Sequence, residues 1–313
     1  METLGEGASL AGRYLVISVM EERDYRTIYL ARDTVHHRQW VIKQFEIPSD
    51  DDQKRELLNH FYAEGARQSE IMIPQLPRVE EFFAERGCVW TVTEQIRGKT
   101  LEECRAESPD GLAEAQVKAW AGTVAEALRF LHGQEPRMVL GGFDREEFVV
   151  TENGDLRLCD YGLARILPSS RRGVIPPEGL PRWYDSDMLR NAKATRQADI
   201  WSLGALCYYA LTGIDARHEG RKALSTVCPK VSDAFAAVVE KCLEPFGDRV
   251  YHSIEEVIDD LSGRQVSERR VPPRLAVDPP VLDFPTVSEG AVALERFKVV
   301  VDQYGSTSHV PEA

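Results

Sequence analysis

The sequence predicts an α+β protein in which a β-rich N-terminal part is followed by a mainly helical part. Five short runs between residues 13 and 95 have the apolar or alternating pattern of β-strands. From residue 115 onward, apolar residues recur at helical spacing instead. Within this second part, Asn153-Gly154 separates two short apolar runs, which is a strong signal for a β-hairpin.

The β-rich part is expected to form a five-stranded antiparallel sheet interrupted by one helix. The helix is predicted at about Asp52–Ile71, because Leu57 and Phe61 recur at helical spacing and carboxylates at residues 50–52 suit a helix N-terminus. The strands are predicted at Arg13–Val19, Thr27–Arg32, Trp40–Phe45, Val79–Phe83 and Val89–Gln95.

The second part is expected to surround one buried helix. Asp199–Leu211 is apolar almost throughout, which is typical of a helix enclosed by others, and Gly213 favours its termination. Ser253 and Glu256 have the spacing of a capping box at the start of a further helix. The remaining helices are predicted at Ala115–His132, Ser232–Leu243 and Ser253–Leu261.

Length and composition are those of an ordinary globular protein. The 313 residues are 43% hydrophobic and 28% charged, which gives room for a two-lobed domain of about 250 residues and a short extra piece. The net charge of −13 argues against broad binding to nucleic acid or anionic membranes. No apolar run approaches the ~18 residues of a membrane helix, and the six scattered cysteines indicate reduced, packed thiols. We therefore expect a cytoplasmic protein without a membrane segment in this chain, whose protein partners the sequence does not identify.

One stretch organises the rest of the chain. Residues 128–165 read LRFLHGQEPRMVLGGFDREEFVVTENGDLRLCDYGLAR, with a hairpin that delivers Asp160-Tyr161-Gly162. This stretch resembles the catalytic and metal-binding loops of protein kinases, in which a loop of the H-R-D-x-x-x-x-N type precedes a hairpin ending in D-F-G. ADIWSLGALCYYALTG and DRVYHS resemble two further kinase motifs. The resemblance covers about residues 10–263 and implies a bilobal fold similar to bacterial serine/threonine protein kinases.

The resemblance also implies where a nucleotide and its metal would bind. Lys43, in VIKQF, matches the strand lysine that contacts the α- and β-phosphates, and Glu64 matches the helix carboxylate that pairs with it. Thr93 and the residues after it resemble the gatekeeper and hinge. The implied nucleotide site comprises Lys43, Glu64, Val41, Thr93, Glu94, Ile96 and Val149, and the implied metal ligands are Asp160 and Glu147.

The catalytic loop departs from the family pattern. Leu140, Gly141 and Gly142 stand where His, Arg and Asp belong, Asp144 replaces the loop lysine, and Glu147 replaces the asparagine. Gly142 has no side chain to orient a hydroxyl group, and Asp144 reverses the charge that steadies the transferred phosphoryl group. We therefore assign no catalytic residue, and Asp144 is the possible substitute base. Glu147 keeps an oxygen that suits Mg²⁺.

The nucleotide-binding loop departs as well. Kinases have G-x-G-x-x-G there, because backbone N–H groups must approach phosphate without a Cβ in the way. Glu21, Arg23 and Arg26 occupy the three glycine positions. Val41 replaces the usual alanine over the adenine, and overpacking a fitted site costs about 1–3 kcal/mol. Binding of ATP and Mg²⁺ is therefore expected to be weak or absent.

Three residues are expected to have structural roles. Asp199 resembles the aspartate that anchors the catalytic-loop backbone, and Arg249 resembles the buried cation of the closing motif. Asp187 is favoured over Glu178 as the partner of Arg249, because it lies twelve residues before Asp199 rather than 21.

The last fifty residues differ in composition. Residues 264–280 form a proline-rich linker, and 281–313 contain LDFPTV and RFKVVVDQYG, which alternate like strands. This tail resembles the first strands of a bacterial immunoglobulin-like module, although a complete module needs about 100 residues.

We interpret the chain as a pseudokinase that acts as a signalling scaffold or regulator with weak or no ATP binding. One alternative is a low-activity serine/threonine kinase that uses Asp160 and Glu147 for metal and Asp144 as base. The other is a nucleotide sensor that binds ATP without turnover.

Overall fold

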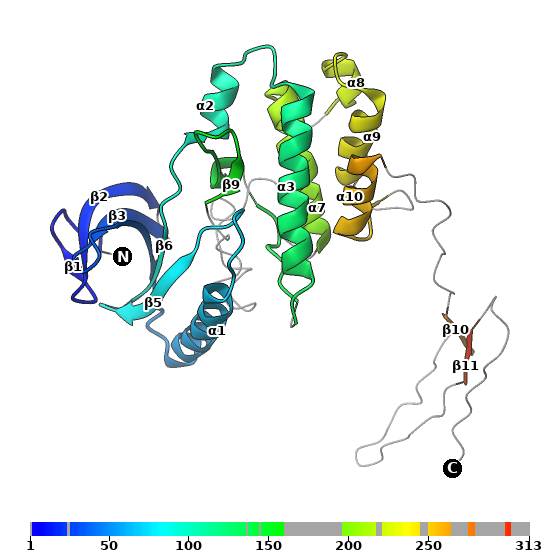
Figure 1. Ribbon diagram of the computed structural model, residues 1–313. Coiled ribbons are helices and arrows are strands. Elements are labelled where there is room, and N and C mark those ends of the chain that lie inside the picture. The colour runs from blue at the N-terminus through cyan, green and yellow to red at the C-terminus, as the bar shows by residue number, and fades with distance from the viewer. Residues whose placement is uncertain are drawn as a thin grey trace. The chain divides into compact units, whose positions relative to one another are not determined.

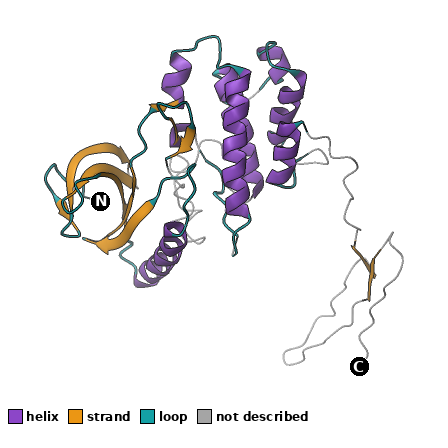
Figure 2. Cartoon of the chain, in the orientation of Figure 1, coloured by secondary structure: helices purple, strands orange, loops and turns teal. Residues whose placement is uncertain are grey.

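The computed structural model describes residues 2–23, 26–135, 137–143, 145–159, 196–216, 221–244 and 250–263, and two short strands at 275–278 and 298–301. The chain divides into two compact units, Met1–Arg264 and Gln265–Ala313. The first unit contains a β-rich lobe and a mainly helical lobe, in the order that the sequence predicts (Figures 1 and 2).

The N-terminal lobe is a sheet of six strands in the order β1-β2-β3-β4-β6-β5, with every pair antiparallel. The prediction of five strands was wrong by one, because the edge strand β1 has only two residues, too few to display alternation. Leu10 in this strand is fully buried, and that burial holds the edge in place. The strands are β1 (Ser9–Leu10), β2 (Tyr14–Arg23), β3 (Arg26–Asp33), β4 (Gln39–Glu46), β5 (Val79–Glu85) and β6 (Cys88–Glu94).

One helix, α1 (Asp51–Ser69), connects β4 to β5. The side chain of Asp50 caps it by accepting a hydrogen bond from the Gln53 N–H at 2.9 Å. Leu57 and Phe61 are buried against the sheet in a small apolar cluster with Phe45 and Val89. The predicted start and apolar face of this helix therefore match the structure.

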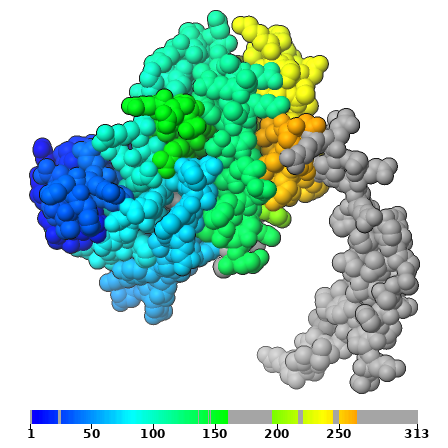
Figure 3. All heavy atoms as spheres, in the orientation of Figure 1, coloured from blue at the N-terminus to red at the C-terminus, as the bar shows by residue number. Residues whose placement is uncertain are grey.

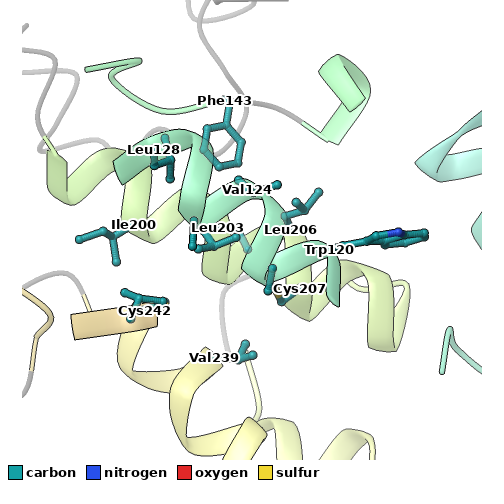
Figure 4. Packing of buried hydrophobic residues seen from close by; sticks show 14 of the residues in the cluster. Trp120, Val124, Leu128, Phe143, Ile200, Leu203, Leu206, Cys207, Val239 and Cys242 are labelled. Carbon is teal, nitrogen blue, oxygen red and sulfur yellow. The ribbon is translucent and has the colours of Figure 1, made fainter. Parts of the chain in front are cut away.

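The helical lobe is packed around α7 (Arg196–Thr212), nearly all of whose residues are buried. Helix α3 (Glu114–His132) lies against it, and close up its residues Val124 and Leu128 lie beside Phe143 of the loop before β8 (Figure 4). No helix in the described ranges is both long and apolar enough to span a membrane. The other elements are β7 (Lys99–Thr100), α2 (Leu101–Ala106), η1 (Arg145–Glu147), β8 (Phe148–Val150), β9 (Leu156–Leu158), α8 (Leu224–Val227), α9 (Asp233–Cys242) and α10 (Ile254–Ser262).

A small sheet in the order β7-β8-β9 lies in the space-filling view between the N-terminal strands and α3 (Figure 3). The hairpin predicted around Asn153-Gly154 forms its β8–β9 part, with Phe148 opposite Leu158 and Val150 opposite Leu156. The segment that leaves the N-terminal lobe therefore continues directly into the sheet that precedes Asp160.

The second unit contains one antiparallel strand pair, β10 (Leu275–Asp278) with β11 (Lys298–Val301). Strand β11 lies within the predicted strand RFKVVVDQYG. Strand β10 lies inside the segment expected to be a linker. The sequence did not predict this strand, because its short apolar run stands between two proline pairs, and proline is uncommon in strands.

Candidate functional site

One face of the N-terminal sheet carries three residues of the predicted nucleotide site. The strand register places Val41 opposite Thr93 and Lys43 opposite Thr91, and side chains at alternate positions share a face. The Thr93 hydroxyl lies 3.4 Å from the carbonyl oxygen of Val41. Lys43 is 3% exposed. The structure thus brings Val41, Lys43 and Thr93 together on one surface.

Two residues at the glycine positions of the family's nucleotide-binding loop form an ion pair in the β2–β3 hairpin. Arg26 donates from Nη2 to Glu21 Oε1 at 2.8 Å, and its side chain is 11% exposed. Glu21 lies opposite Ile28, which lies opposite Lys43, so these residues share one face of the sheet. Two charged side chains therefore pair on the surface that glycines would leave bare. The side chain of Arg23 lies outside the described residues.

Helix α1, which packs against β5, carries Glu64. Glu64 Oε1 accepts a hydrogen bond from Arg67 Nη1 at 2.8 Å, one turn further along the helix. Its pairing with Lys43 remains a prediction. The adjacent Gly65 packs so closely that a Cβ there would lie 2.6 Å from the ring of Phe82 on β5.

Glu94, the first residue of the hinge, bonds to strand β9 of the small sheet. Its two carboxylate oxygens accept hydrogen bonds from Arg157 on β9, at 3.0 and 3.1 Å. Burial opposes ionisation of Glu94, but the Arg157 hydrogen bonds and the Arg78 backbone N–H outweigh it, so the pKa of Glu94 is lowered. The carboxylate is therefore a structural anion that fixes the hinge to β9.

The chain after the hinge lies directly on β8. Ile96 and Val149 are both half-buried, and Thr100 pairs with Val149 in the strand register. A Cβ on Gly98 would collide with the carbonyl oxygen of Val150. Glycine at this position thus allows the close approach that places the hinge segment over β8.

Asp199 fixes the backbone of the loop that contains Leu140 and Gly142, the residues at the catalytic positions. The carboxylate is fully buried and accepts hydrogen bonds from the Leu140 N–H at 3.0 Å and the Gly142 N–H at 2.8 Å. His132 Nε2 lies 2.8 Å from the same carboxylate. Asp199 therefore fixes the backbone of the loop with its two oxygens, and α3 contributes the third contact.

Further contacts fix the loop's shape. The Phe143 N–H donates to the Ser202 hydroxyl at 3.1 Å. Gly141 has φ 75° and Gly142 has φ 96°, values that residues with a side chain rarely adopt. The two residues that replace Arg and Asp of the family pattern thus sit in conformations that favour glycine.

The predicted metal ligands are only partly described. The Glu147 carbonyl accepts from the N–H of Cys159 at 2.6 Å, so Glu147 adjoins the residue that precedes Asp160. Asp144, Asp160, Asp187 and Arg249 lie outside the described residues. Within the ranges given above, no three His, Cys, Asp or Glu side chains gather in a way that could hold a metal ion.

Two arginines of this region were not singled out in the sequence. Arg157 stands between two buried leucines of β9, and that alternation could have shown that it points away from them. Arg145 is 11% exposed, donates to Glu102 on α2 at 3.0 Å and lies 4.2 Å from the ring centroid of Tyr209 on α7. These two neighbours come from distant parts of the sequence, so no local pattern indicated them.

Comparisons with known proteins agree with this geometry. The family model described as "Protein kinase domain" matches residues 22–275. Serine/threonine-protein kinase dkf-2 of Caenorhabditis briggsae is 32% identical over 130 residues, which cover 40% of this chain and 10% of that protein. Nek1 of Mus musculus is 23% identical over 201 residues, covering 64% of this chain and 16% of that protein. The matched region is therefore a small part of these relatives' length.

Solved structures share the fold. The kinase domain of Mycobacterium tuberculosis PknI has a TM-score of 0.64 at 17% identity, with 83% of this chain and 99% of that chain covered. PpkA-294 in its apo form has a TM-score of 0.64 at 18% identity, with the same coverage of 83% and 99%. At these identities the likeness shows the fold, and the predicted bilobal architecture is confirmed.

Proposed function

Because the chain belongs to the protein kinase family, we propose that it is a catalytically impaired member, a pseudokinase that acts as a signalling scaffold or regulator. Kinases of this family generally transfer the γ-phosphoryl group of ATP with the help of Mg²⁺. What is impaired here is the transfer step, and the fold that presents surfaces to partners is retained.

Gly142 is the observation that carries this proposal. It stands at the position of the catalytic aspartate, and its N–H is committed to Asp199 at 2.8 Å. With φ at 96°, the backbone is unsuited to a residue that carries a side chain. Loss of a positioned general base typically costs about 10²–10⁴ in rate, and Asp144 on the same loop reverses the charge of the lysine that would steady the phosphoryl group.

The hairpin does not fit a phosphate cradle. Glu21 would place a carboxylate against phosphate oxygens, and the buried Arg26 is already paired with it at 2.8 Å. Each charge-assisted contact that the backbone can no longer make is worth about 1.5–3 kcal/mol. Two or three such losses would move a micromolar site toward the millimolar range.

Lys43 supports a second candidate, a nucleotide sensor that binds ATP without turnover. This lysine is 3% exposed and lies opposite Thr91. It corresponds to the strand lysine that contacts the α- and β-phosphates in the family, and this correspondence is the observation that favours the sensor.

Two measurements test these functions together. Purified protein is incubated with radiolabelled ATP and Mg²⁺, and incorporation is compared with that of Asp160→Ala; we expect the two to be equal. ATP affinity is then measured by calorimetry with and without Mg²⁺; we expect a millimolar dissociation constant or none. Incorporation that needs metal and disappears in Asp160→Ala would overturn the pseudokinase proposal.

A triple variant distinguishes a nucleotide site that the charged hairpin obstructs from a nucleotide site that is lost. Glycines at Glu21, Arg23 and Arg26 should strengthen ATP binding if the charged hairpin is the obstacle. Low-micromolar binding by the parent protein that is lost in Lys43→Ala would instead establish the sensor.

A further inference from the structure

A groove rich in arginine lies at one end of the N-terminal strands, beside the hinge. It has a volume of about 720 Å³, and Arg32, Arg38, Arg78 and Arg97 contribute to its lining, with Trp40. A smaller hollow of about 300 Å³ shares Arg38, Trp40 and Arg78 and extends the groove toward His36. The lining comes from the end of β3, the turn that follows it, the start of β4 and the hinge.

The carboxylates near this groove are already neutralised by other arginines. Glu94 is held by Arg157 at 3.0 Å, and Glu80 accepts from Arg13 at 3.1 Å as well as from Arg78 at 2.8 Å. They therefore leave little negative charge for the remaining arginines of the groove.

Among the described residues, no carboxylate pairs with three of the four guanidinium groups. Arg97 donates to the neutral amide oxygen of Gln39 at 2.8 Å. The side chains of Arg32 and Arg38 are exposed, and in the described part of the chain neither has an ion pair or a hydrogen bond. The chain has 51 acidic and 38 basic residues. The local charge of this groove is therefore opposite in sign to the net charge of the chain.

The floor of the groove is fixed in place. Trp40 is 5% exposed, and the Arg78 guanidinium lies over its ring, 5.2 Å from the centroid. Arg32 and Gln39 are cross-strand partners of β3 and β4, and the Arg78 carbonyl accepts from the Glu94 N–H at 2.9 Å. The backbone and Trp40 therefore need little ordering when a ligand binds, and the ordering cost falls on the exposed side chains of Arg32 and Arg38.

We propose that this groove binds a phosphorylated segment of a partner polypeptide. A phosphate group carries nearly two negative charges and three acceptor oxygens, and the planar guanidinium fork matches it with two parallel hydrogen bonds. Clusters of arginine are the usual means of reading phosphorylated motifs. The volume admits several residues around the phosphate, while the net charge of −13 opposes a long polyanion such as nucleic acid.

This proposal goes beyond a pseudokinase scaffold by naming a class of partner, and it does not require ATP. The test is fluorescence anisotropy of the full chain with two libraries of short degenerate peptides, one with a central phosphoserine and one with serine. A single-stranded oligonucleotide of similar length is the third probe. The assay contains no nucleotide triphosphate, so its result is independent of the phosphotransfer experiment.

The variant Arg32→Gln with Arg38→Gln removes the two unpaired cations, and Arg55→Gln with Arg129→Gln is its control. The control arginines are exposed and pair on α1 and α3 with Asp52 and Glu126, so the change in net charge is equal. We expect the phosphoserine library to bind, and the groove variant to bind it about tenfold or more weakly while the control is unchanged. Equal melting temperatures would show that the variants are folded.

Three outcomes would overturn the proposal. They are equal affinity for the phosphoserine and serine libraries, equal weakening in the groove and control variants, and stronger binding of the oligonucleotide than of the phosphoserine library. Absence of binding to every probe would count against it as well, because the libraries sample all neighbouring residues.

Discussion

Two adjacent glycines relate the proposed loss of activity to backbone geometry as well as to a missing side chain. Gly141 and Gly142 both have positive φ, at 75° and 96°, and the second is bonded to Asp199 through its N–H. An aspartate placed at residue 142 would have to adopt a conformation that L-residues avoid. Restoring the family residue at one position is therefore not expected to restore the function.

Gly142→Asp is predicted to leave phosphotransfer undetectable and to lower stability by about 1–2 kcal/mol. Gly154→Asp is the matched control, since Gly154 also has positive φ, at 84°, but lies in open space. Thermal melting and incorporation of labelled phosphate are the measurements. A gain of metal-dependent transfer in Gly142→Asp alone would contradict the prediction.

Asp33 gives the N-terminal lobe a dependence on pH. The Arg13 guanidinium, helped by His36 and opposed by burial, holds the pKa of Asp33 well below its usual value of 3.8. Its contribution to stability is complete above pH 3.8 and is lost as the pH falls below that value.

Asp33→Asn should therefore cost about 3 kcal/mol at neutral pH, because it removes one partner of a buried pair. The difference from the parent should shrink on acidification below the usual aspartate pKa. Urea denaturation at several pH values measures it, with Asp155→Asn in the exposed turn as control. A difference that stayed constant down to the acid transition would be evidence against this pair.

At the scale of elements, the packing of α1 against β5 depends on the absence of one methyl group. A Cβ at Gly65 would lie 2.6 Å from the Phe82 ring, whereas one at Gly122, on α3, would meet nothing within 4 Å. Replacement of glycine by alanine inside a helix normally stabilises by about 1 kcal/mol.

Gly65→Ala and Gly122→Ala are predicted to change stability in opposite directions. Gly122→Ala should raise it by about 1 kcal/mol, and Gly65→Ala should lower it by about 1–3 kcal/mol because Phe82 and α1 must move apart. Chemical denaturation of both variants provides the comparison. If both were stabilised, the close contact between α1 and β5 would be excluded.

Helix caps illustrate what local sequence can and cannot predict. The capping-box spacing of Ser253 and Glu256 predicted a cap, but the Ser253 side chain makes no cap hydrogen bond, and Glu256 accepts from the His252 N–H at 3.1 Å instead. Thr100 and Glu103 form a complete capping box on α2 that the sequence analysis overlooked. The two patterns are alike in sequence, and the backbone conformation before each helix decides between them.

The same limit applies to the candidate site. Strand periodicity and family spacing placed Val41, Lys43 and Thr93 correctly on one sheet, because register follows from alternation. The hydrogen bonds between Glu94 and Arg157 join residues 63 positions apart, and no local pattern reports such a pair. Residues that act through long-range contacts were therefore the ones missed.

For the whole molecule, the division at Arg264 makes a direct prediction. The unit Met1–Arg264 has its own core, and Gln265–Ala313 has its own strand pair. A chain that ends at Arg264 should therefore melt at the same temperature as the full chain. Differential scanning calorimetry measures this, and a lower melting temperature of the shorter chain would contradict it.

The fold of the first unit could be predicted because several kinase motifs occur in the right order over about 250 residues. The short strands β1 and β10 could not, since β1 has only two residues and β10 stands between two proline pairs. Function was less accessible. Gly142 lacks a side chain and Asp144 reverses a charge relative to the family pattern, but neither difference indicates what the remaining surface binds.

The hydrogen bonds that Asp199 accepts from the loop have a consequence for amide hydrogen exchange. Loops usually exchange their amide protons quickly, because small local openings expose them to water. The N–H groups of Leu140 and Gly142 donate instead to a carboxylate inside α7, the most buried helix of the described chain. They should exchange only when the core itself opens, at rates like those of α7 amides. We therefore predict that this loop belongs, by its exchange rates, to the slowest-opening unit of the described chain.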